Sequence, residues 1–375
     1  MDRRAITFLK SRVPTALRQR AVLLLKLAVA AALIGWLFAS GKIDFNQLGS
    51  VGKRWPWFAL AQVPFGVVMF LCACRWRLLL KAQGIHYSLG DIFSLTMIGQ
   101  LFNQFMMGTT GGDMVKAYAV AMEQPERRGA GIISVFVDRI VGLLVLVLVA
   151  LVGILFNLSL IRSRPELVFL AILVVSVFAA SLVAGYVFYS DRIRSSGLVG
   201  WCLSRLPFRR LLGQLSQAVY VYKFHRREVL IVVALSLLLH VCVVAMNLCL
   251  ARAILVGPLP WVNFFFLIPL AQIAMAIPIN PPGAIGTAEG IYAYLFTLAR
   301  ISEGAMVCLL QRITHYLWAL VGCFLYLKRK GKLDQAMAAA HRSEDEKEES
   351  ESAFDRFEKK ASAQVVSAEE PVRGT

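Results

Sequence analysis

Charged side chains are scarce in this sequence. They make up 17% of the 375 residues, whereas hydrophobic residues make up 58% and the mean hydropathy is +0.65. A soluble domain usually carries about 25% charged and about 45–50% apolar residues. The shortage excludes an ordinary soluble globular domain. It predicts an all-α polytopic membrane protein, because each membrane-spanning helix needs about 20 apolar residues to cross a bilayer.

The sequence also lacks the patterns of a metal, disulfide or cofactor site. It has seven cysteines and five histidines, but no Cys-x-x-Cys pair and no histidine cluster. The cysteines lie mostly within apolar stretches, where a reduced thiol serves as a small hydrophobic side chain. We therefore expect no metal and no cofactor.

Acidic residues are few outside the C-terminal end. Residues 341–375 hold ten of the 23 Asp and Glu residues, which leaves 34 basic and 13 acidic residues in 1–340. Such an excess would suit a nucleic-acid partner. However, the basic residues flank hydrophobic runs, and the rule that cytoplasmic loops are positive accounts for them. We therefore expect no nucleic-acid partner.

Hydrophobic runs predict six full crossings and two re-entrant hairpins. A basic leader (1–20) precedes a membrane domain (21–330), and a charged, disordered tail (331–375) follows it. Basic residues in the leader, in the segment 191–228 and after the last crossing place all three in the cytoplasm. We expect a multi-pass protein of the cell (inner) membrane with both termini cytoplasmic. The expected crossings are 21–39, 57–74, 129–156, 166–189, 229–251 and 303–327.

The two hairpins follow from the orientation of their neighbours. The second crossing finishes inside and the third starts inside, so residues 82–128 must enter and leave on the same side. Residues 260–302 must do the same on the outside. Neither segment can then be a single crossing. We expect the chain to turn within the membrane at Gly108–Asp113 and at Pro278–Glu289, where glycines supply unusual backbone conformations.

An internal repeat supports this arrangement. Each half contains an arginine, a turn with a carboxylate, and a second arginine, at spacings of 38 and 26 residues in one half and 37 and 23 in the other. With three crossings per half, the halves (about 21–156 and 166–327) are expected to be inverted, a recurring transporter design. The residues are Arg75, Asp113 and Arg139 in the first half, and Arg252, Glu289 and Arg312 in the second.

Polar residues near the turns predict a cavity that binds a lipid head group. Irregular backbone at membrane depth is tolerated where it lines a polar cavity. The helices that restart after each turn present N–H groups and a positive dipole end to an anion. No catalytic residue is expected. The expected substrate-binding residues are Asn103, Gly111, Gly112, Asp113, Lys116, Asp138, Arg139, Asn280, Gly286, Glu289 and Arg312.

The two arginines within crossings can be explained in two ways. A charge inside a crossing costs at least ~2.5–3.5 kcal/mol, so Arg139 and Arg312 should each reach a hairpin carboxylate or a ligand phosphate. A carboxylate partner would give the two arginines a structural role, whereas a ligand phosphate would give them a role in binding. Likewise Asp113 and Thr287 are suited simply to cap the restarted helices.

These segments resemble a known family. Leu101–Asn103, Gly111–Tyr118, Ser134–Gly142 and Pro278–Gly290 are similar to signatures of the lysylphosphatidylglycerol synthase transmembrane-region family, over roughly residues 20–330. The resemblance implies a flippase-like domain whose free-standing relatives handle aminoacylated phospholipids, hopanoids or polyprenyl-linked glycans. The 45 residues that follow the membrane domain are too few for a synthase domain, so no enzyme activity is expected.

The hypothesis is therefore a lipid translocase, or another lipid-handling membrane protein. Its partner would be an anionic phospholipid or a polyprenyl-phosphate-linked lipid, because up to four arginines (Arg75, Arg139, Arg252 and Arg312) are expected to converge near the midplane. Replacing Arg139 or Arg312 by alanine is expected to abolish function without preventing insertion. Two alternatives stay open: a non-transporting subunit of a lipid- or glycan-synthesis complex, and a polyprenyl-phosphate-dependent glycosyltransferase. The expected external loops are short and poor in acids, which disfavours the glycosyltransferase.

Overall fold

The protein is an all-α polytopic membrane protein, and the part of it that the structure describes contains no β-strand. The first expected crossing, the leader and the tail lie outside that part. Five described helices are long and apolar enough to cross a bilayer: Trp55–Ala82, Pro125–Phe156, Pro165–Val183, Arg226–Ile254 and Gly304–Arg329. The computed structural model describes residues 49, 51–106, 111–189, 222, 225–255, 257–276 and 281–329.

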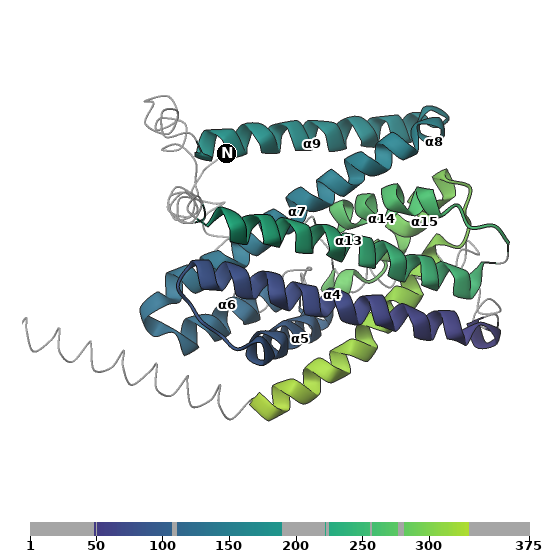
Figure 1. Ribbon diagram of the computed structural model, residues 1–375. Helices are drawn as coiled ribbons and strands as arrows, with labels where there is room; N and C mark the ends of the chain where they lie inside the picture. The colour runs from purple at the N-terminus through teal and green to yellow at the C-terminus, as the bar shows by residue number, and fades with distance from the viewer. Residues whose placement is uncertain are drawn as a thin grey trace, which may run out of the picture.

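The described part of the chain contains both long and short helices, and the short ones include two consecutive pairs, α5–α6 and α14–α15 (Figure 1). The long ones are α4 (Trp55–Ala82), α7 (Arg128–Phe156), α9 (Pro165–Tyr189), α13 (Arg226–Ile254) and a last helix, Gly304–Arg329. The short ones are α5 (Leu89–Phe105), α6 (Gly111–Glu123), α8 (Leu158–Arg162), α14 (Trp261–Met275) and α15 (Thr287–Leu298), with 3-10 turns η1 (Pro125–Arg127) and η2 (Pro282–Ala284).

Contacts between helix ends show that α4 and α13 run in opposite directions. Arg54, just before α4, donates a hydrogen bond to the carbonyl of Leu255, just after α13, at 2.7 Å. At the other end, the hydroxyl of Tyr222, which precedes α13, donates to the carbonyl of Leu79 at 3.1 Å. We name the two ends of the bundle the Leu255 end and the Tyr222 end.

The two pairs of short helices open on opposite ends of this bundle. At the Tyr222 end, Arg329 of the last helix binds both Asp91 at the start of α5 and Glu123 at the end of α6. At the Leu255 end, Asn157 just after α7 donates to the carbonyl of Val262 at the start of α14. Figure 1 shows α5 and α6 toward one end of the bundle and α14 and α15 toward the other.

The tips of the two helix pairs meet inside the bundle. The second turn packs so tightly on the end of α5 that a Cβ at Gly283 would lie 2.9 Å from the Gln104 carbonyl oxygen. Gly283 and Gly286 have φ angles of 60° and 80°, a conformation that glycine adopts at no steric cost. The expected role of glycine at this turn is therefore correct. Residues 107–110 of the first turn lie outside the described residues.

The glycines after the first turn have a different role from the expected one. Gly111 and Gly112 are the first residues of α6, and neither has a positive φ. Gly112 instead allows α5 and α6 to touch, because a Cβ there would lie 2.0 Å from the Gly99 carbonyl oxygen. Small residues permit this close backbone approach between membrane helices.

Arg329→Gln is expected to loosen α5 and α6 at the Tyr222 end. The guanidinium donates to Asp91 Oδ1 at 3.2 Å and to the two Glu123 oxygens at 2.8 and 3.1 Å, and the side chain is only 12% exposed. Hydrogen bonds to charged groups are worth about 1.5–3 kcal/mol. The midpoint of thermal unfolding in detergent should fall, and Lys328→Gln should leave it nearly unchanged. Equal effects of the two substitutions would contradict this role of Arg329.

Candidate functional site

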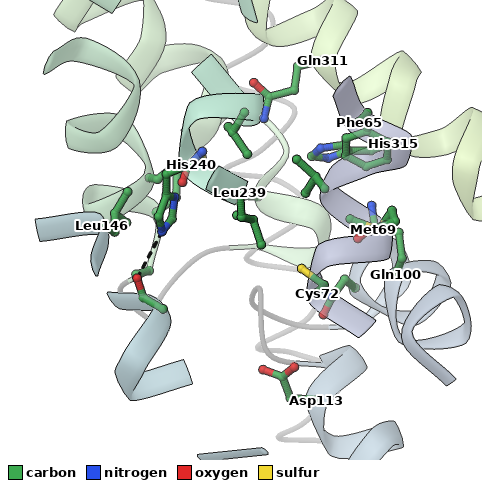
Figure 2. A pocket seen from close by; sticks show the side chains of 18 of the residues that line it. Phe65, Met69, Cys72, Gln100, Asp113, Leu146, Leu239, His240, Gln311 and His315 are labelled. Carbon is green, nitrogen blue, oxygen red and sulfur yellow. Dashed lines mark hydrogen bonds between the residues drawn. The ribbon is translucent and has the colours of Figure 1, made fainter. Parts of the chain in front are cut away.

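A cavity of about 370 Å³ lies where the helix pairs meet. Its walls come from α4, α5, α6, α7, α13, α14, the second turn, α15 and the last helix. Figure 2 shows Asp113 at one end of the view and Gln311 at the other, with Leu146 and Leu239 between them. Ligand pockets commonly measure about 300–1,000 Å³, so the cavity has the size of a small-ligand site.

The first ion pair of the cavity joins α4 to α7. Arg75 Nε donates to Asp138 Oδ1 at 2.7 Å and Nη2 to Oδ2 at 2.8 Å, while Nη1 donates to the Ser236 hydroxyl of α13 at 3.2 Å. The side chains of Arg75 and Asp138 are 8% and 11% exposed. This two-point geometry is the strongest that arginine makes with a carboxylate.

The length of α4 corrects the expected end of the second crossing. The crossing was expected to end at residue 74, but α4 continues to Ala82, so Arg75 is buried within the helix rather than just beyond it. The charge is tolerated because Asp138 neutralises it. The signal that could have shown this is the apolar run Leu78–Leu80, which follows Arg75 and continues the helix.

The second ion pair holds the turn between α14 and α15. Arg312 Nε donates to Glu289 Oε1 at 2.6 Å, and Arg312 Nη1 and Nη2 donate to the carbonyls of Gly283 and Ala284 at 2.7 and 3.3 Å. Glu289 is 2% exposed and its other oxygen accepts from the Gly286 N–H at 2.8 Å. Arg312 therefore fastens the last helix to the turn, although it also lines the cavity.

The third set of charges consists of Asp113, Lys116 and Arg139, which we call the charged triad. Arg139 Nε donates to Asp113 Oδ2, and Lys116 Nζ lies 3.9 Å from Asp113 Oδ1. Lys116 Nζ also lies 5.4 Å from the centroid of the Trp76 ring. The Arg139 side chain is 44% exposed, against 13% for Asp113 and Lys116. Arg139 and Lys116 thus share the carboxylate of Asp113, and of these two cations Arg139 is the accessible one.

Protein groups already occupy the helix N-termini that were expected to face an anion. The Gly112 N–H donates to Asn103 Oδ1 at 2.7 Å, and the Gly286 N–H donates to Glu289. Neither Asp113 nor Thr287 makes these caps, since Asp113 binds Arg139 and the Thr287 hydroxyl donates to the Ala284 carbonyl. The charged triad, rather than these N-termini, therefore offers the cavity's accessible positive charge.

The structure brings most of the expected binding residues together. Those that line the cavity are Asn103, Asp113, Lys116, Asp138, Arg139 and Arg312. Gly111, Gly112, Gly286 and Glu289 do not line it; they form the starts of α6 and α15. Asn280 lies outside the described residues. Arg252 does not join the other arginines, because it donates to the Gly257 carbonyl at the Leu255 end at 2.9 Å.

Arg75, His240 and His315 line the cavity but were not among the expected binding residues. Arg75, which was expected only to lie near the midplane, occupies the wall between α4, α7 and α13. Trp76, which does not itself line the cavity, is buried beside Lys116. His240 Nε2 lies 3.2 Å from the Gly142 carbonyl oxygen, and the His315 ring packs on Phe65 with centroids 4.9 Å apart (Figure 2). Single polar residues within crossings carry little signal in a sequence, since most form helix–helix hydrogen bonds.

Comparison with known proteins connects this architecture to a family. A family model described as the lysylphosphatidylglycerol synthase TM region matches residues 23–322. The matched range includes both pairs of short helices and the whole charged triad. No match was found among curated proteins. The chain therefore belongs to the lysylphosphatidylglycerol synthase transmembrane-region family.

Proposed function

We propose that this protein is a lipid translocase that moves an anionic, phosphate-bearing lipid between the leaflets of the membrane. The observation that carries the proposal is the cavity of about 370 Å³ between two helix pairs that open on opposite ends of the bundle. One part of its wall holds the charged triad and another is apolar, with Leu146 and Leu239 (Figure 2). A head group would enter the cavity while its acyl chains remain in the bilayer.

In this proposal the helix pairs are re-entrant hairpins. α5 and α6 have 17 and 13 residues, and α14 and α15 have 15 and 12. All four are shorter than the roughly 20 residues that a full crossing needs. Each pair enters and leaves at one end, and each carries a carboxylate bound by an arginine of the crossing that follows it. These equivalences support an inverted repeat, in which alternating access arises by movement of one half against the other.

The proposed location is the cell (inner) membrane with both termini in the cytoplasm. The Tyr222 end would then be cytoplasmic. It carries a cluster of basic residues, as the rule that cytoplasmic loops are positive requires. The cluster includes Lys81, Arg127, Arg128, Arg226 and Arg227.

A topology experiment tests this orientation. In an otherwise cysteine-free chain, a cysteine at Gln83 should react with a membrane-impermeant maleimide only after cells are opened. A cysteine at Gly257, near the opposite end, should react in intact cells whose outer barrier is permeable to the reagent. The reverse pattern would show that the assignment of the two ends is wrong.

The cavity carboxylates disfavour a glycosyltransferase. Such an enzyme needs a carboxylate free to act as a base, whereas Asp113 and Asp138 are both bound by arginines. We therefore propose that the protein is not an enzyme. A non-transporting subunit of a synthesis complex is the remaining alternative, and a transport assay with the purified protein separates it from a translocase.

Arg139→Gln is expected to slow lipid transfer at least about tenfold, because hydrogen bonds to charged groups are worth about 1.5–3 kcal/mol. The fold should survive, since Asp113 keeps Lys116 as a partner. The assay uses proteoliposomes with fluorescent phosphatidylglycerol and an impermeant quencher. Arg300→Gln, outside the cavity, is the control and should transfer like the wild type. Transfer by the wild type no faster than in empty liposomes would favour the non-transporting alternative.

A further inference from the structure

In the part of the chain that the structure describes, the charged residues around the cavity leave one formal positive charge in excess. Among the described residues, four cations line the cavity: Arg75, Lys116, Arg139 and Arg312. Three carboxylates are bound to them, namely Asp138, Asp113 and Glu289. The two turns outside the described residues, 107–110 and 277–280, contain no charged side chain in the sequence. They therefore leave this balance unchanged.

Lys116 is the cation whose charge is least compensated. Arg75 and Arg312 each bind a carboxylate through short hydrogen bonds. Arg75 also donates to the Ser236 hydroxyl, and Arg312 also donates to carbonyls of the second turn. Asp113 is in close contact with Arg139, whereas Lys116 Nζ stands 3.9 Å away, at the outer limit of an ion pair. The Trp76 ring attracts the ammonium group without neutralising it.

The position of Lys116 is fixed by its surroundings. Its side chain is 13% exposed and runs against Gly99, where an added Cβ would lie 2.8 Å from Lys116 Cε. The ammonium group is therefore held at the cavity wall rather than extended into water. In such a poorly solvated site an uncompensated charge is costly, and a ligand with one opposite charge relieves that cost.

We infer that the cavity accepts a head group with a single negative charge, a phosphodiester, and that Lys116 is the residue that sets this charge. The inference rests on the proposed function and narrows its substrate class. A phosphodiester carries one negative charge, whereas a phosphate monoester carries about 1.5–2 near pH 7. A monoester or a pyrophosphate would bring a second charge that no described cavity residue balances.

The test compares lipids with matched acyl chains on the purified full-length protein in detergent. Phosphatidylglycerol is the phosphodiester, phosphatidic acid the monoester, diacylglycerol pyrophosphate the more highly charged probe, and diacylglycerol the neutral one. At pH 7.5 the expected order of stabilisation against heat places phosphatidylglycerol first. A polyprenyl-phosphate-linked sugar, also a phosphodiester, is a separate arm that distinguishes an isoprenoid from a glycerolipid source.

A measurement at lower pH separates the effect of the head group's charge from the effect of its shape. The second pKa of a phosphate monoester is about 6, so phosphatidic acid carries about one charge at pH 5.5. Its stabilising effect should rise toward that of phosphatidylglycerol, whose own charge does not change. Lys116→Met should weaken the apparent affinity for phosphatidylglycerol at least tenfold and abolish its advantage over diacylglycerol. Lys116→Arg, which keeps the charge, should retain most of that advantage.

The outcomes of this experiment are distinguishable. Stabilisation by phosphatidic acid or pyrophosphate at pH 7.5 that equals or exceeds that by phosphatidylglycerol would overturn the inference. So would a Lys116→Met protein that still prefers phosphatidylglycerol to diacylglycerol by the wild-type margin. If no lipid stabilises the wild type and no transfer occurs in liposomes, the proposed function fails as well. Equal stabilisation by both phosphodiester lipids would support recognition of the shared phosphate linkage.

Discussion

Arg75→Ala is expected to produce one of the largest losses of stability in the protein. The substitution leaves Asp138 as a buried carboxylate without its two-point partner, and it removes a donor to Ser236. Breaking a buried ion pair in this way costs about 3–5 kcal/mol. The free energy of unfolding, measured by denaturant titration in detergent, should fall by that amount. Arg77→Ala, two residues along α4, should cost far less, because Arg77 makes an exposed bond to the Tyr87 carbonyl.

A double substitution shows whether Arg75 and Asp138 act on each other. Replacing Arg75 by Met and Asp138 by Leu removes both charges, and such apolar replacements are often neutral or stabilising. The double variant should therefore recover most of the stability that the single variant loses. It also leaves the charge balance of the cavity unchanged, so lipid transfer should persist. A double variant as unstable as the sum of the two single ones would contradict the pairing.

The arrangement of the helices was the part most open to prediction from the sequence. Apolar runs longer than about 18 residues leave few alternatives to a crossing. The alternation of basic ends then required two segments that enter and leave on one side. The pairs Arg139–Asp113 and Arg312–Glu289 were also within reach, since a charge buried in a crossing must find a partner and the turns offered one carboxylate each.

What the sequence could not show depends on the three-dimensional register of helices far apart in the chain. Arg75 and Asp138 are 63 residues apart, and a charge at the end of an apolar run is usually the end of a crossing. The cap that Asn103 makes on the Gly112 N–H depends on how α5 lies against α6. For the same reason, the glycines of α6 were assigned to a turn when they serve a helix contact.

Gly112→Ala is expected to destabilise the protein and to stop lipid transfer. The Cβ would lie 2.0 Å from the Gly99 carbonyl oxygen and 2.6 Å from its carbonyl carbon. These are backbone atoms that cannot turn aside, so α5 and α6 must separate. The separation also breaks the 2.7 Å hydrogen bond from the Gly112 N–H to Asn103. Overpacking of this kind costs about 1–3 kcal/mol.

The direction in which Gly112→Ala shifts the unfolding temperature is informative, because alanine is the better helix former. Within a helix, glycine is less favourable than alanine by about 0.8–1 kcal/mol, so propensity alone would make Gly112→Ala stabilising. Gly290→Ala is the matched control: Gly290 lies in α15, and nothing is within 4 Å of a Cβ there. We expect Gly290→Ala to raise the unfolding temperature slightly and Gly112→Ala to lower it.

Because Asp113 and Lys116 follow Gly112 on α6, the displaced helix should also move the charged triad, so transfer should fail even below the unfolding temperature. If both substitutions stabilise the protein alike, α5 and α6 do not make the close contact on which this reasoning depends.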